Sequence, residues 1–364
     1  MASKSANRIV ISGYYGFRNT GDEAILLSML NSIKTLLPGA QCVVLSGNPA
    51  DTEMKFDVPS VHRFNLWGIV RELRHCHLFV SGGGSLLQDV TSSRSLVYYL
   101  FLMLLAHWLG KPVMLYAQGV GPIHSSFLRK LTGWVLRKVD FITVRDRESA
   151  EFLQSLGVQR SRIKLTADVV FLLERMSLDD GRVLLNRYGA GTTTGLVGVA
   201  VRSWEGDKYF GALVDALDQI ADQGKQLLLI PFQYPGDMAC ARKLQRALRH
   251  PSKILEQACD TGEMLSLIGN LDSLIGMRLH SLIFAAVMGV PFVALDYDPK
   301  VQGFVKSVGG SSAGTMSTLT TNSILQAYTQ AGQVQVDLTA LKKLAAENNN
   351  LLVNILREGS LVKC

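Results

Sequence analysis

The sequence predicts two α/β domains in tandem, each a doubly wound sheet of parallel strands. Short apolar runs that indicate buried strands alternate with longer amphipathic stretches along most of the chain. This alternation fades over residues 177–194 and then resumes. The chain has 364 residues, and a domain typically needs roughly 100–200 residues. These three observations together favour two domains over one.

The first half contains five runs that we expect to be buried strands of a parallel sheet. They are residues 8–12, 42–46, 77–81, 112–117 and 140–144. Amphipathic helices are expected between the strands, for example over residues 22–36 and 127–138. A strand, a helix and a further strand in this order predict crossover connections and therefore parallel pairing.

The second half repeats the pattern. Its expected strands are residues 196–201, 226–231, 272–276 and 291–295, and a long amphipathic helix is expected over residues 336–359. We therefore predict a Rossmann-like domain, a linker, a second Rossmann-like domain and a C-terminal helix over residues 1–178, 179–194, 195–330 and 331–364. Two such domains facing one another would place their strand carboxyl ends around one cleft, where open α/β sheets bind ligands.

Composition excludes some classes of protein. Hydrophobic residues make up 48% and charged residues 18%, so wholesale disorder is not expected. The net charge of +7 suits a phosphorylated ligand, a nucleic acid or an anionic membrane. The sequence contains no basic stripe with interleaved aromatic residues, which disfavours nucleic-acid binding. The five cysteines form no CxxC pair, which argues against a disulfide framework or zinc ribbon. With an N-terminal apolar run too short for a signal peptide, this predicts a cytoplasmic protein.

The most apolar stretch is residues 96–110, about 15 residues that include His107. A helix needs roughly 20 apolar residues to cross a bilayer. We therefore expect a buried core helix rather than an interfacial membrane helix.

A glycine-rich loop, GYYGFRNTGDEA (residues 13–24), follows the first predicted strand. Its spacing is not that of a dinucleotide-binding motif, and no acidic residue is placed to bind a ribose. Tyr15, Phe17, Arg18 and Asn19 supply aromatic, cationic and amide groups. Either these side chains stack on and hydrogen-bond a sugar, or they pack an ordinary turn.

Three glycines in SGGGSLLQD (residues 81–89) follow the third predicted strand. Their backbone amides suit a phosphate or a sugar hydroxyl, but the lysine of a Walker loop is absent, which disfavours nucleotide hydrolysis. Asp89 is either a base or sugar ligand, or a cap or loop anchor. Gln118 and Arg145 stand at the ends of the next two strands, and Arg145 is either a surface ion pair or a ligand contact.

In the second half, the motif GMRLHS (residues 276–281) joins a strand to an apolar helix. Arg278, His280 and Ser281 are therefore expected at or near the helix N-terminus. Free backbone N–H groups and the helix dipole favour an anion at this position and disfavour a cation that has no anion beside it. This mismatch predicts ligand binding rather than a structural cap. Arg202 occupies another strand end in the same half.

The next strand ends in DYDPK, residues 296–300. Lys300 either reaches the same anion as His280 or is a solvated lysine at a helix start. The tripeptide DYD resembles the metal-binding DxD of one glycosyltransferase class, but it is too common to predict a metal site.

Seven motifs stand in one order along residues 8–306: GYYGFRNTGDEA, SGGGSLLQD, AQGVGP, VRDRES, TADVVF, GMRLHSLIFAA and DYDPKVQGF. As a set they resemble the polysaccharide pyruvyl transferases, specifically those of the CsaB type. The resemblance implies two Rossmann-like domains facing a cleft, as in GT-B glycosyltransferases.

The implied activity is transfer of pyruvate from phosphoenolpyruvate to a sugar as a ketal, with release of phosphate. The implied acceptor is N-acetylmannosamine of a polyprenyl-diphosphate-linked saccharide, a precursor of secondary cell wall polymer whose ketal anchors surface-layer proteins. The resemblance implies no metal and no organic cofactor, since phosphoenolpyruvate is a substrate. Contact with the inner face of the cell membrane would be peripheral, through the lipid-linked substrate and exposed basic residues.

The resemblance places phosphoenolpyruvate at Arg278 and His280, with Arg202 as a further contact. It also assigns Tyr15, Phe17, Arg145 and Lys300 to the active centre. We therefore take His280, Arg278 and Lys300 as catalytic candidates, with Arg202 and Ser281 added for donor binding. The acceptor-binding candidates are Tyr15, Phe17, Asn19, Asp22, Gly83, Asp89, Gln118 and Arg145. The base that deprotonates the sugar remains open among Asp22, Asp89 and Asp168.

Two other functions stay open at this point. One is a nucleotide-sugar glycosyltransferase on the same GT-B fold, and the other is a non-catalytic saccharide-binding protein. The sequence gives no indication of the oligomeric state.

Overall fold

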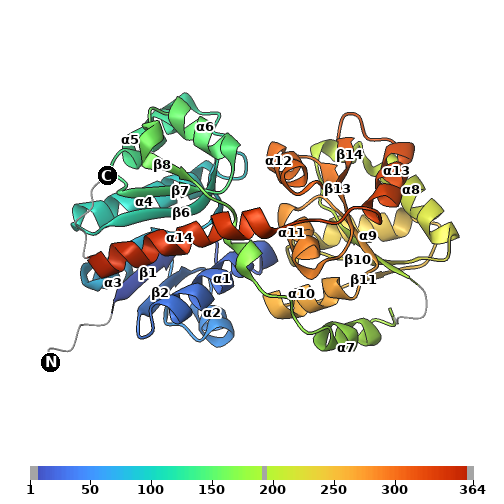
Figure 1. Ribbon diagram of the computed structural model, residues 1–364, viewed down its shortest axis with the longest axis horizontal. Coiled ribbons are helices and arrows are strands. Elements are labelled where there is room, and N and C mark those ends of the chain that lie inside the picture. Colours follow the sequence, from blue (N-terminus) through green and yellow to red (C-terminus); the bar gives the residue numbers. More distant parts are fainter. Residues whose placement is uncertain (1–6, 191–194, 359–364) are drawn as a thin grey trace. The chain divides into compact units, whose positions relative to one another are not determined.

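The computed structural model describes residues 7–190 and 195–358, which form two compact units. The N-terminal unit comprises residues 7–17, 22–172 and 339–358, and the C-terminal unit comprises residues 18–21, 173–190 and 195–338. Each unit is built on its own parallel sheet with helices on its faces (Figure 1). The predicted fold class of two Rossmann-like, doubly wound domains is confirmed.

The N-terminal sheet has eight strands. They are β1 (Arg8–Ser12), β2 (Gln41–Ser46), β3 (Ser60–His62), β4 (Leu78–Ser81), β5 (Gly84–Leu87), β6 (Val113–Val120), β7 (Phe141–Val144) and β8 (Ile163–Leu165). Their order is β3-β2-β1-β4-β6-β7-β8, with β5 paired to β6. The order changes direction between β1 and β4, which is the switch point where such sheets bind ligands.

The helices of this unit connect the strands. They are α1 (Thr20–Leu36), α2 (Pro49–Phe56), α3 (Leu66–His75), α4 (Ser93–Trp108), α5 (Ser126–Leu136), α6 (Arg147–Ser155), the 3-10 turns η1 (Arg160–Arg162) and η2 (Val169–Leu172), and α14 (Thr339–Glu358). Ser92, Ser125 and Asp146 begin α4, α5 and α6 by accepting a hydrogen bond from the backbone amide three residues later.

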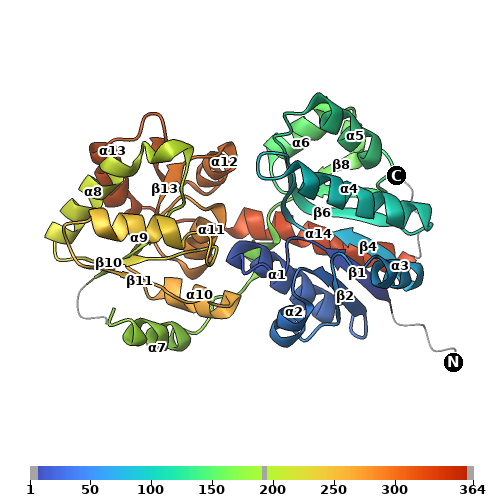
Figure 2. The same ribbon diagram turned by 180° about the vertical axis from the view of Figure 1, so that it is seen from behind.

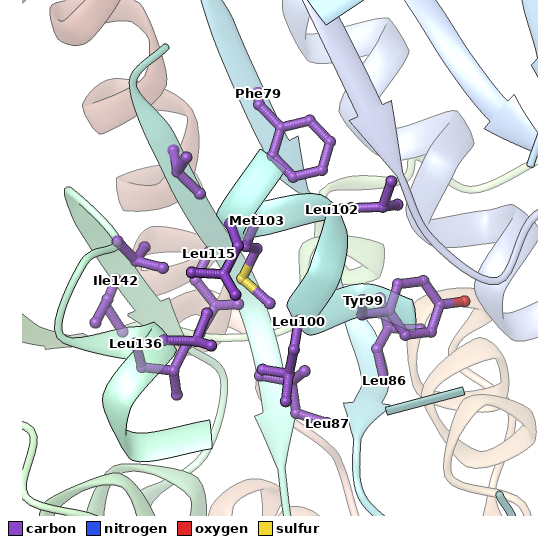
Figure 3. Close-up of a cluster of buried hydrophobic side chains, with 14 of the residues drawn as sticks. Phe79, Leu86, Leu87, Tyr99, Leu100, Leu102, Met103, Leu115, Leu136 and Ile142 are labelled. Carbon is purple, nitrogen blue, oxygen red and sulfur yellow. The ribbon is translucent and has the colours of Figure 1, made fainter. Parts of the chain in front are cut away.

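One hydrophobic core of the N-terminal unit lies between the sheet and the layer of helices α3, α4, α5 and α6. Phe79 and Leu115 of the strands pack there with Leu100, Met103 and Leu136 of the helices (Figure 3). All five side chains are at most 1% exposed. Residues 96–108 thus belong to a helix, α4, whose inner side is part of the core as predicted, whereas Val97, Phe101 and Trp108 on its outer side are exposed. No helix in the described part of the chain is both long and apolar enough to cross a membrane.

Helix α14 covers the other face of the same sheet, in front of the strands in Figure 1. Tyr116, which alternates with Leu115 along β6, donates its hydroxyl to Asn349 of α14. Asn348 accepts a hydrogen bond from the Thr166 hydroxyl at 2.9 Å and donates to the Ala167 carbonyl at 3.1 Å. The C-terminal helix therefore completes the N-terminal unit.

The C-terminal sheet has six parallel strands. They are β9 (Leu196–Ala200), β10 (Gln226–Leu229), β11 (Ser252–Ile254), β12 (Ser273–Gly276), β13 (Phe292–Asp296) and β14 (Ser311–Thr315). Their order is β11-β10-β9-β12-β13-β14, with a switch point between β9 and β12.

Seven helices and one 3-10 turn pack on the described part of this sheet (Figure 2). They are α7 (Asp179–Arg187), η3 (Glu205–Asp207), α8 (Phe210–Asp222), α9 (Met238–Ala247), α10 (Thr261–Gly269), α11 (Leu279–Met288), α12 (Pro299–Val308) and α13 (Thr321–Ala331).

The structure divides the chain differently from the sequence in three places. Most of the predicted linker, residues 179–187, is helix α7, which packs on α10 through a 2.7 Å hydrogen bond from the Gly181 amide to the Ser266 hydroxyl. Residues 191–194 of that linker lie outside the described residues. The predicted C-terminal helix belongs to the N-terminal unit, and residues 18–21 belong to the C-terminal unit. Helix α7, the C-terminal helix and residues 18–21 are each placed by contacts with segments distant in sequence, which a local pattern does not show.

Candidate functional site

The C-terminal unit gathers its predicted cationic residues at one edge of the sheet. Arg202 follows β9 and Arg278 follows β12, and these two strands are neighbours at the switch point. Lys300 follows β13, the next strand, in the first turn of α12. Because all six strands are parallel, their carboxyl ends meet at this edge.

Arg278 occupies the N-cap position of α11, and its guanidinium is held by two side chains. Its Nε donates to Asp237 Oδ2 at 2.7 Å and its Nη2 donates to Asp237 Oδ1 at 2.5 Å. A third bond, from Nη2 to Gln233 Oε1, measures 3.1 Å. Two parallel bonds to one carboxylate fix the plane of a guanidinium. Asp237 therefore orients Arg278 at the start of α11.

His280 lies in the first turn of α11 beside Gly21. A Cβ atom at Gly21 would be 2.3 Å from His280 Nδ1, so only glycine leaves room for the imidazole. The segment that carries Gly21 is joined to the C-terminal unit by the Thr20 amide, which donates to the Phe232 carbonyl at 3.4 Å. Asn19, in the same segment as Gly21, forms an isolated antiparallel β-bridge with Gln233.

The position of Asn19 bears on its predicted role. We assigned Asn19 to the acceptor, with the other residues of the first loop. The structure instead groups Asn19 with the unit that carries Arg278 and next to Gln233, which contacts Arg278. Its side-chain oxygen accepts a hydrogen bond from the Gly21 amide at 3.2 Å. Asn19 thus shapes the loop against which His280 packs.

The Arg202 guanidinium lies near two aromatic rings. Its guanidinium carbon lies 5.9 Å from the centroid of Trp204 and 5.8 Å from that of Tyr297, and these two rings meet edge to face at 5.0 Å. Burial raises the pKa of Tyr297, although the positive charge of Arg202 partly opposes this. The Arg202 Nε is buried and has no hydrogen-bond partner among the described residues. A buried donor of this kind is normally satisfied by a ligand or water.

Ser281 and the two aspartates of DYD serve the fold in this structure. The Ser281 hydroxyl is buried and donates to the Arg278 carbonyl at 2.7 Å. Asp298 caps α12 by accepting from the Lys300 amide at 2.8 Å. Asp296 accepts from the Ser312 hydroxyl at 2.7 Å, and burial raises its pKa. Among the residues the structure describes, no three His, Cys, Asp or Glu side chains are grouped to hold a metal ion.

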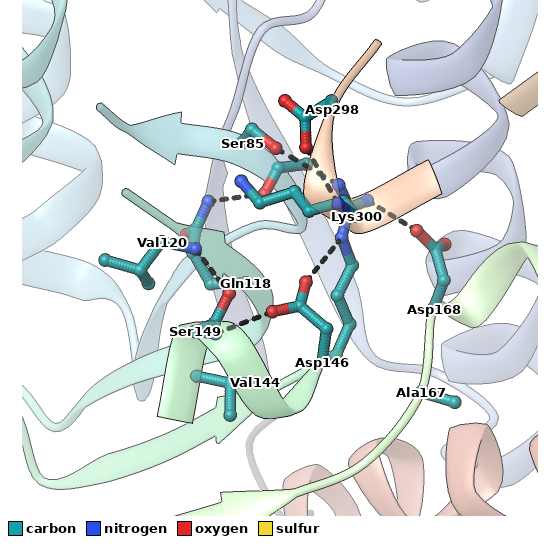
Figure 4. A network of polar contacts seen from close by, with 12 residues as sticks. Ser85, Gln118, Val120, Val144, Asp146, Ser149, Ala167, Asp168, Asp298 and Lys300 are labelled. Atoms are coloured by element: carbon teal, nitrogen blue, oxygen red, sulfur yellow. Dashed lines mark hydrogen bonds and ion pairs between the residues drawn. The ribbon is translucent and has the colours of Figure 1, made fainter. Parts of the chain in front are cut away.

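Arg145 is the centre of a polar network in the N-terminal unit. Its Nη1 donates to Asp168 Oδ2 at 2.6 Å, its Nη2 donates to the Ser85 hydroxyl at 3.1 Å, and its Nε lies 3.7 Å from Asp146 Oδ2. Figure 4 shows Ser85, Asp146 and Asp168 converging from three segments. Burial would lower the pKa of Arg145, but the negative charges of Asp168 and Asp146 raise it overall. Arg145 thus forms a buried ion pair with Asp168, whereas the structural alternative considered from the sequence was an ion pair on the surface.

Tyr15 is packed inside the N-terminal unit. It is 0% exposed, and its hydroxyl has no hydrogen-bond partner among the described residues. A Cβ at Gly13 would lie 2.3 Å from Tyr15 Cζ, and one at Gly82 would lie 2.3 Å from its Oη. Burial raises the pKa of Tyr15 well above its ordinary value, and the nearby Asp22 adds to this. In this conformation Tyr15 fills a slot between two glycines and offers no face to a sugar.

Phe17 remains partly accessible. Its ring stacks on Tyr14 with centroids 4.3 Å apart, and the Arg63 guanidinium lies 5.3 Å from its centroid. A Cβ at Gly47 would come within 2.5 Å of the ring. The half-buried aromatic group of this loop is therefore the stacked pair of Tyr14 and Phe17, of which the sequence interpretation named one member.

The remaining acceptor-side candidates lie around the glycine loop. Asp22 is half-buried, and its Oδ1 lies 2.6 Å from where a Cβ at Gly84 would stand, so it borders the loop backbone. Gly84 has a φ of +94°, which favours glycine. Gly83 packs on Ile25, and Gln118 is fully buried and donates to the Gly84 carbonyl at 3.0 Å. These contacts hold the loop in place.

Asp89 anchors the loop that precedes α5. Its carboxylate accepts hydrogen bonds from the amides of His124 and Ser125, each at 2.9 Å. Burial alone would raise the pKa of Asp89, but these two amides lower it overall. The structural interpretation of Asp89 weighed from sequence is therefore realised, while binding of a sugar stays a prediction.

Sequence reasoning missed the residues that support the cationic cluster. Gln233 and Asp237 hold Arg278, and Trp204 and Tyr297 lie near the Arg202 guanidinium. Trp204 stands two residues after Arg202 and Tyr297 stands within DYD, so proximity to the motifs was a usable signal for these two. Asp237 had no such signal, because forty residues separate it from Arg278.

The two doubly wound parallel sheets place the chain in the class of GT-B-like α/β proteins. Solved structures similar to the chain include Anabaena HepE in complex with UDP and glucose, with 15% identity, a TM-score of 0.63, and 97% and 100% of the two chains covered. They also include the UDP-GlcNAc 2-epimerase of Neisseria meningitidis bound to UDP-GlcNAc, with 12% identity, a TM-score of 0.62 and coverage of 96% and 100%. At these identities the likeness concerns the fold alone.

The family follows from the sequence match. The model of the polysaccharide pyruvyl transferase family matches residues 19–299, and the chain belongs to this family. A curated relative, the amylovoran biosynthesis protein AmsJ of Erwinia amylovora, is 24% identical over 260 residues. The match covers 65% of this chain and about three fifths (61%) of the length of AmsJ.

Proposed function

We propose that this chain transfers pyruvate from phosphoenolpyruvate to a sugar, forms a ketal and releases phosphate. The observation that carries the proposal is the pair of arginines, Arg202 and Arg278, at the ends of neighbouring strands β9 and β12. A small substrate with a carboxylate and a phosphate needs two such donors. Membership of the pyruvyl transferase family supports the same reaction.

The C-terminal unit would bind the donor. The N-termini of α11 and α12 both open at this edge, where backbone N–H groups and the helix dipole favour an anion. Arg278 is held in one plane by Asp237, and the unsatisfied Nε of Arg202 needs an acceptor. We assign Arg278, Arg202 and Lys300 to the charges of phosphoenolpyruvate. Ser281 would act by shaping the helix start, since its hydroxyl donates a hydrogen bond to the Arg278 carbonyl.

Ketal formation converts the methylene carbon of phosphoenolpyruvate into a methyl group. Two sugar oxygens form bonds to C2, and the bond from C2 to the phosphate oxygen breaks. One hydroxyl proton is balanced by the proton gained at the methylene carbon, and the other leaves with phosphate. His280 is suited to transfer one of these protons, because imidazole both accepts and donates near neutral pH. Arg278 and Arg202 would stabilise charge on the carboxylate and the departing phosphate.

The N-terminal unit would bind the acceptor near its glycine loop. Asp22 borders this loop at Gly84, and the Tyr14–Phe17 pair lies in the neighbouring loop that follows β1. Arg145, paired with Asp168, would orient the Ser85 hydroxyl at the same edge of the sheet. We propose N-acetylmannosamine of a polyprenyl-diphosphate-linked saccharide as the acceptor and secondary cell wall polymer as the product pathway, as in the CsaB type. The reaction would take place in the cytoplasm with no cofactor.

The decisive experiment combines the protein with phosphoenolpyruvate and a synthetic lipid-diphosphate disaccharide. Mass spectrometry should show the acceptor gain one pyruvate, and phosphorus NMR should show inorganic phosphate. The same spectra with UDP-sugars in place of phosphoenolpyruvate test the nucleotide-sugar glycosyltransferase. Release of UDP there, with no use of phosphoenolpyruvate, would replace the proposed reaction, and acceptor binding without any product would indicate a saccharide-binding protein.

Substitutions at the cationic cluster test the assignment of residues. Arg278→Ala and His280→Ala should each lower kcat/KM for phosphoenolpyruvate about tenfold to a hundredfold or more, since a charge-assisted hydrogen bond contributes about 1.5–3 kcal/mol. Arg246→Ala, an exposed arginine on α9, is the matched control and should leave kcat/KM unchanged. Near-normal turnover in the first two variants would remove the cluster from the mechanism.

A further inference from the structure

Helices α3, α4 and α5 form one continuous outer layer of the N-terminal unit. Their buried residues, such as Leu73, Leu100 and Leu128, belong to a single core on one face of the sheet. Helices α4 and α5 pack on each other, and Tyr98 of α4 donates to the Arg63 carbonyl, ahead of α3, at 2.9 Å. Figure 2 shows the three helices on the same face of the sheet. The opposite side of the layer points away from the protein core.

This outward side carries large apolar side chains in helical register. On α4, Val97, Phe101 and Trp108 are 43%, 40% and 65% exposed, and their spacing of four and seven residues keeps them on one side of the helix. On α5, Phe127 and Trp134 are 71% and 42% exposed and stand seven residues apart. Both helices thus bury one side and expose a second apolar side.

The start of α3 extends the same surface. Phe64, Leu66 and Trp67 are 71%, 51% and 87% exposed, and Phe64 packs edge to face on Tyr98 of α4. Of the thirteen large hydrophobic side chains exposed in the described part of the chain, eight belong to this layer. We call this surface the aromatic face, after its members Phe64, Trp67, Phe101, Trp108, Phe127 and Trp134. Exposed apolar surface concentrated in this way marks an interaction site.

The positive charge of the chain is concentrated in the segment that builds this layer. Residues 58–139 contain nine Lys and Arg against two Asp and Glu, a balance of +7 that equals the net charge of the whole chain. Both acidic side chains are already engaged. Glu72 is 5% exposed and pairs with Arg8 and Arg71, and Asp89 accepts from the amides of His124 and Ser125. Outside this segment the charges cancel.

We infer that the aromatic face docks on the surface of an anionic lipid bilayer. Tryptophan and other aromatic rings partition to the headgroup level of membranes, where their apolar bodies and polar edges are both accommodated. Lysine and arginine beside them attract acidic headgroups. The combination fits shallow docking of a folded layer and requires no segment that crosses the membrane.

A second copy of the chain is a poorer occupant for this surface. Two aromatic faces brought together would oppose the same positive excess, +7 against +7, which disfavours association. An anionic bilayer complements both the charge and the apolar area. The inference goes beyond the proposed transfer reaction, because docking on vesicles requires neither phosphoenolpyruvate nor an acceptor sugar.

The test measures binding of the full chain to vesicles of phosphatidylcholine with and without phosphatidylglycerol. The protein should float with the anionic vesicles and not with the neutral ones, and salt should weaken the binding. Three of the four tryptophans of the chain lie on this layer, so tryptophan emission should shift to shorter wavelength on binding. Failure of the wild-type protein to bind anionic vesicles would overturn the inference.

Two sets of variants locate the binding surface. Trp67→Ser, Trp108→Ser and Phe127→Ser together should weaken vesicle binding tenfold or more. Arg74, Arg94 and Lys130 are exposed on α3, α4 and α5 at helical spacing from Trp67, Phe101 and Phe127. Arg74→Glu, Arg94→Glu and Lys130→Glu together should weaken binding about a hundredfold or more, since each basic residue near an anionic surface contributes about fivefold. All six side chains are exposed, so folding should be retained, as circular dichroism would check.

Matched controls change the same chemistry elsewhere. Met54→Ser with Val183→Ser removes apolar side chains that are 78% and 52% exposed outside the aromatic face. Arg242→Glu, Arg246→Glu and Lys253→Glu reverse three exposed charges of the C-terminal unit. Both controls should bind vesicles as the wild type does. Equal binding by the test variants and the wild type would place docking elsewhere and overturn the inference.

Two further readouts separate the outcomes. If size-exclusion chromatography shows a dimer that the aromatic variants dissociate, and vesicles are not bound, the face is an interface between copies and the inference is wrong. Transfer to a soluble acceptor, measured on the same variants, should be unchanged. Loss of transfer in all proteins with vesicle binding intact would refute the proposed function and leave the docking surface standing.

Discussion

Asp237 is the residue on which the orientation of Arg278 depends. It receives two guanidinium bonds from Arg278 and also accepts from the Gln233 amide at 2.9 Å. Its side chain is 4% exposed and that of Arg278 is 14% exposed, so the pair is well shielded from water. A charge at this depth that loses its partner destabilises the fold as well as the site.

We therefore expect Asp237→Asn to raise KM for phosphoenolpyruvate about tenfold while kcat falls less, because Arg278 keeps its charge and loses its fixed plane. The melting temperature should also fall. Steady-state kinetics and a thermal shift measurement check both effects. Asp215→Asn, a substitution elsewhere in this unit, is a control for loss of one carboxylate. A large loss of kcat with unchanged KM in Asp237→Asn would contradict a positioning role.

Tyr15 and Gly82 offer a test of whether the buried tyrosine is structural. The Tyr15 hydroxyl has no hydrogen-bond partner among the described residues, and a Cβ at Gly82 would overlap it at 2.3 Å. Tyr15→Phe should leave thermal stability equal or higher, because an unsatisfied buried hydroxyl is removed. Gly82→Ala should destabilise the wild type, and Tyr15→Phe should partly rescue it.

Melting temperatures of the two single variants and the double variant measure this coupling. Additive effects would show that Gly82 and Tyr15 do not share the slot. Activity of Tyr15→Phe then addresses the acceptor role predicted from sequence. Unchanged KM for the acceptor would leave Tyr15 as a packing residue, and a tenfold increase would return its hydroxyl to the site.

At the scale of elements, the first turns of two helices make a matched pair. Gly21 and Gly262 are each the second residue of a helix, α1 and α10. A Cβ at Gly21 would lie 2.3 Å from His280 Nδ1, whereas a Cβ at Gly262 would lie 3.4 Å from its nearest neighbour, Asp260 Oδ1. The same substitution therefore meets an imidazole in one helix and tolerable space in the other.

We expect Gly21→Ala to lower kcat about a hundredfold, since displacement of a catalytic group by about 1 Å has effects of this size. Gly262→Ala should keep kcat and slightly raise stability, because alanine is the better helix former. Measurements of kcat and melting temperature for both variants test these expectations. Full activity of Gly21→Ala would mean that the His280 ring has another acceptable position.

The strength of the local pattern decided which elements were predictable. Strands β1, β9 and β12 were placed within one or two residues, because each is a buried run of apolar residues. Strands β3, β8 and β11 have three residues each, too few to show a period, and went unnoticed. Helix α7 was taken for linker, although it buries Leu184 and Leu185, because its nine residues are too few for a clear period and the glycine- and threonine-rich stretch 189–195 follows directly.

At the scale of the whole molecule, α14 links the end of the chain to the N-terminal unit. It buries Ala345 and Leu352 and bonds to Thr166 and Tyr116. We expect a chain that ends at Leu338 to lose roughly 5 °C or more from the thermal transition of the N-terminal unit, because one face of its sheet becomes exposed.

Differential scanning calorimetry can follow this change, since two compact units are expected to give separable transitions. A chain that ends at residue 358 is the control and should melt as the full chain does. The transition of the C-terminal unit should be unchanged by either deletion. An equal decrease in both transitions would indicate that α14 supports the whole molecule.

The sequence by itself determined the fold class and the strand ends that carry charged side chains. Buried parallel strands are continuous apolar runs, and the residues that follow them, such as Arg202 and Arg278, are therefore readable from position alone. Family membership followed from the same ordered motifs, as the match over residues 19–299 confirms.

Only the tertiary structure decided what surrounds those side chains. Asp237 holds Arg278 across forty intervening residues, and Tyr15 is buried between Gly13 and Gly82. Residues 18–21 and 339–358 each belong to the unit that is more distant in sequence. It also showed that the apolar residues of α3, α4 and α5 left outside the core lie on one positively charged layer. A local pattern records burial and turning of the chain, whereas partners in space depend on how sheets and helices pack, which no short window of sequence contains.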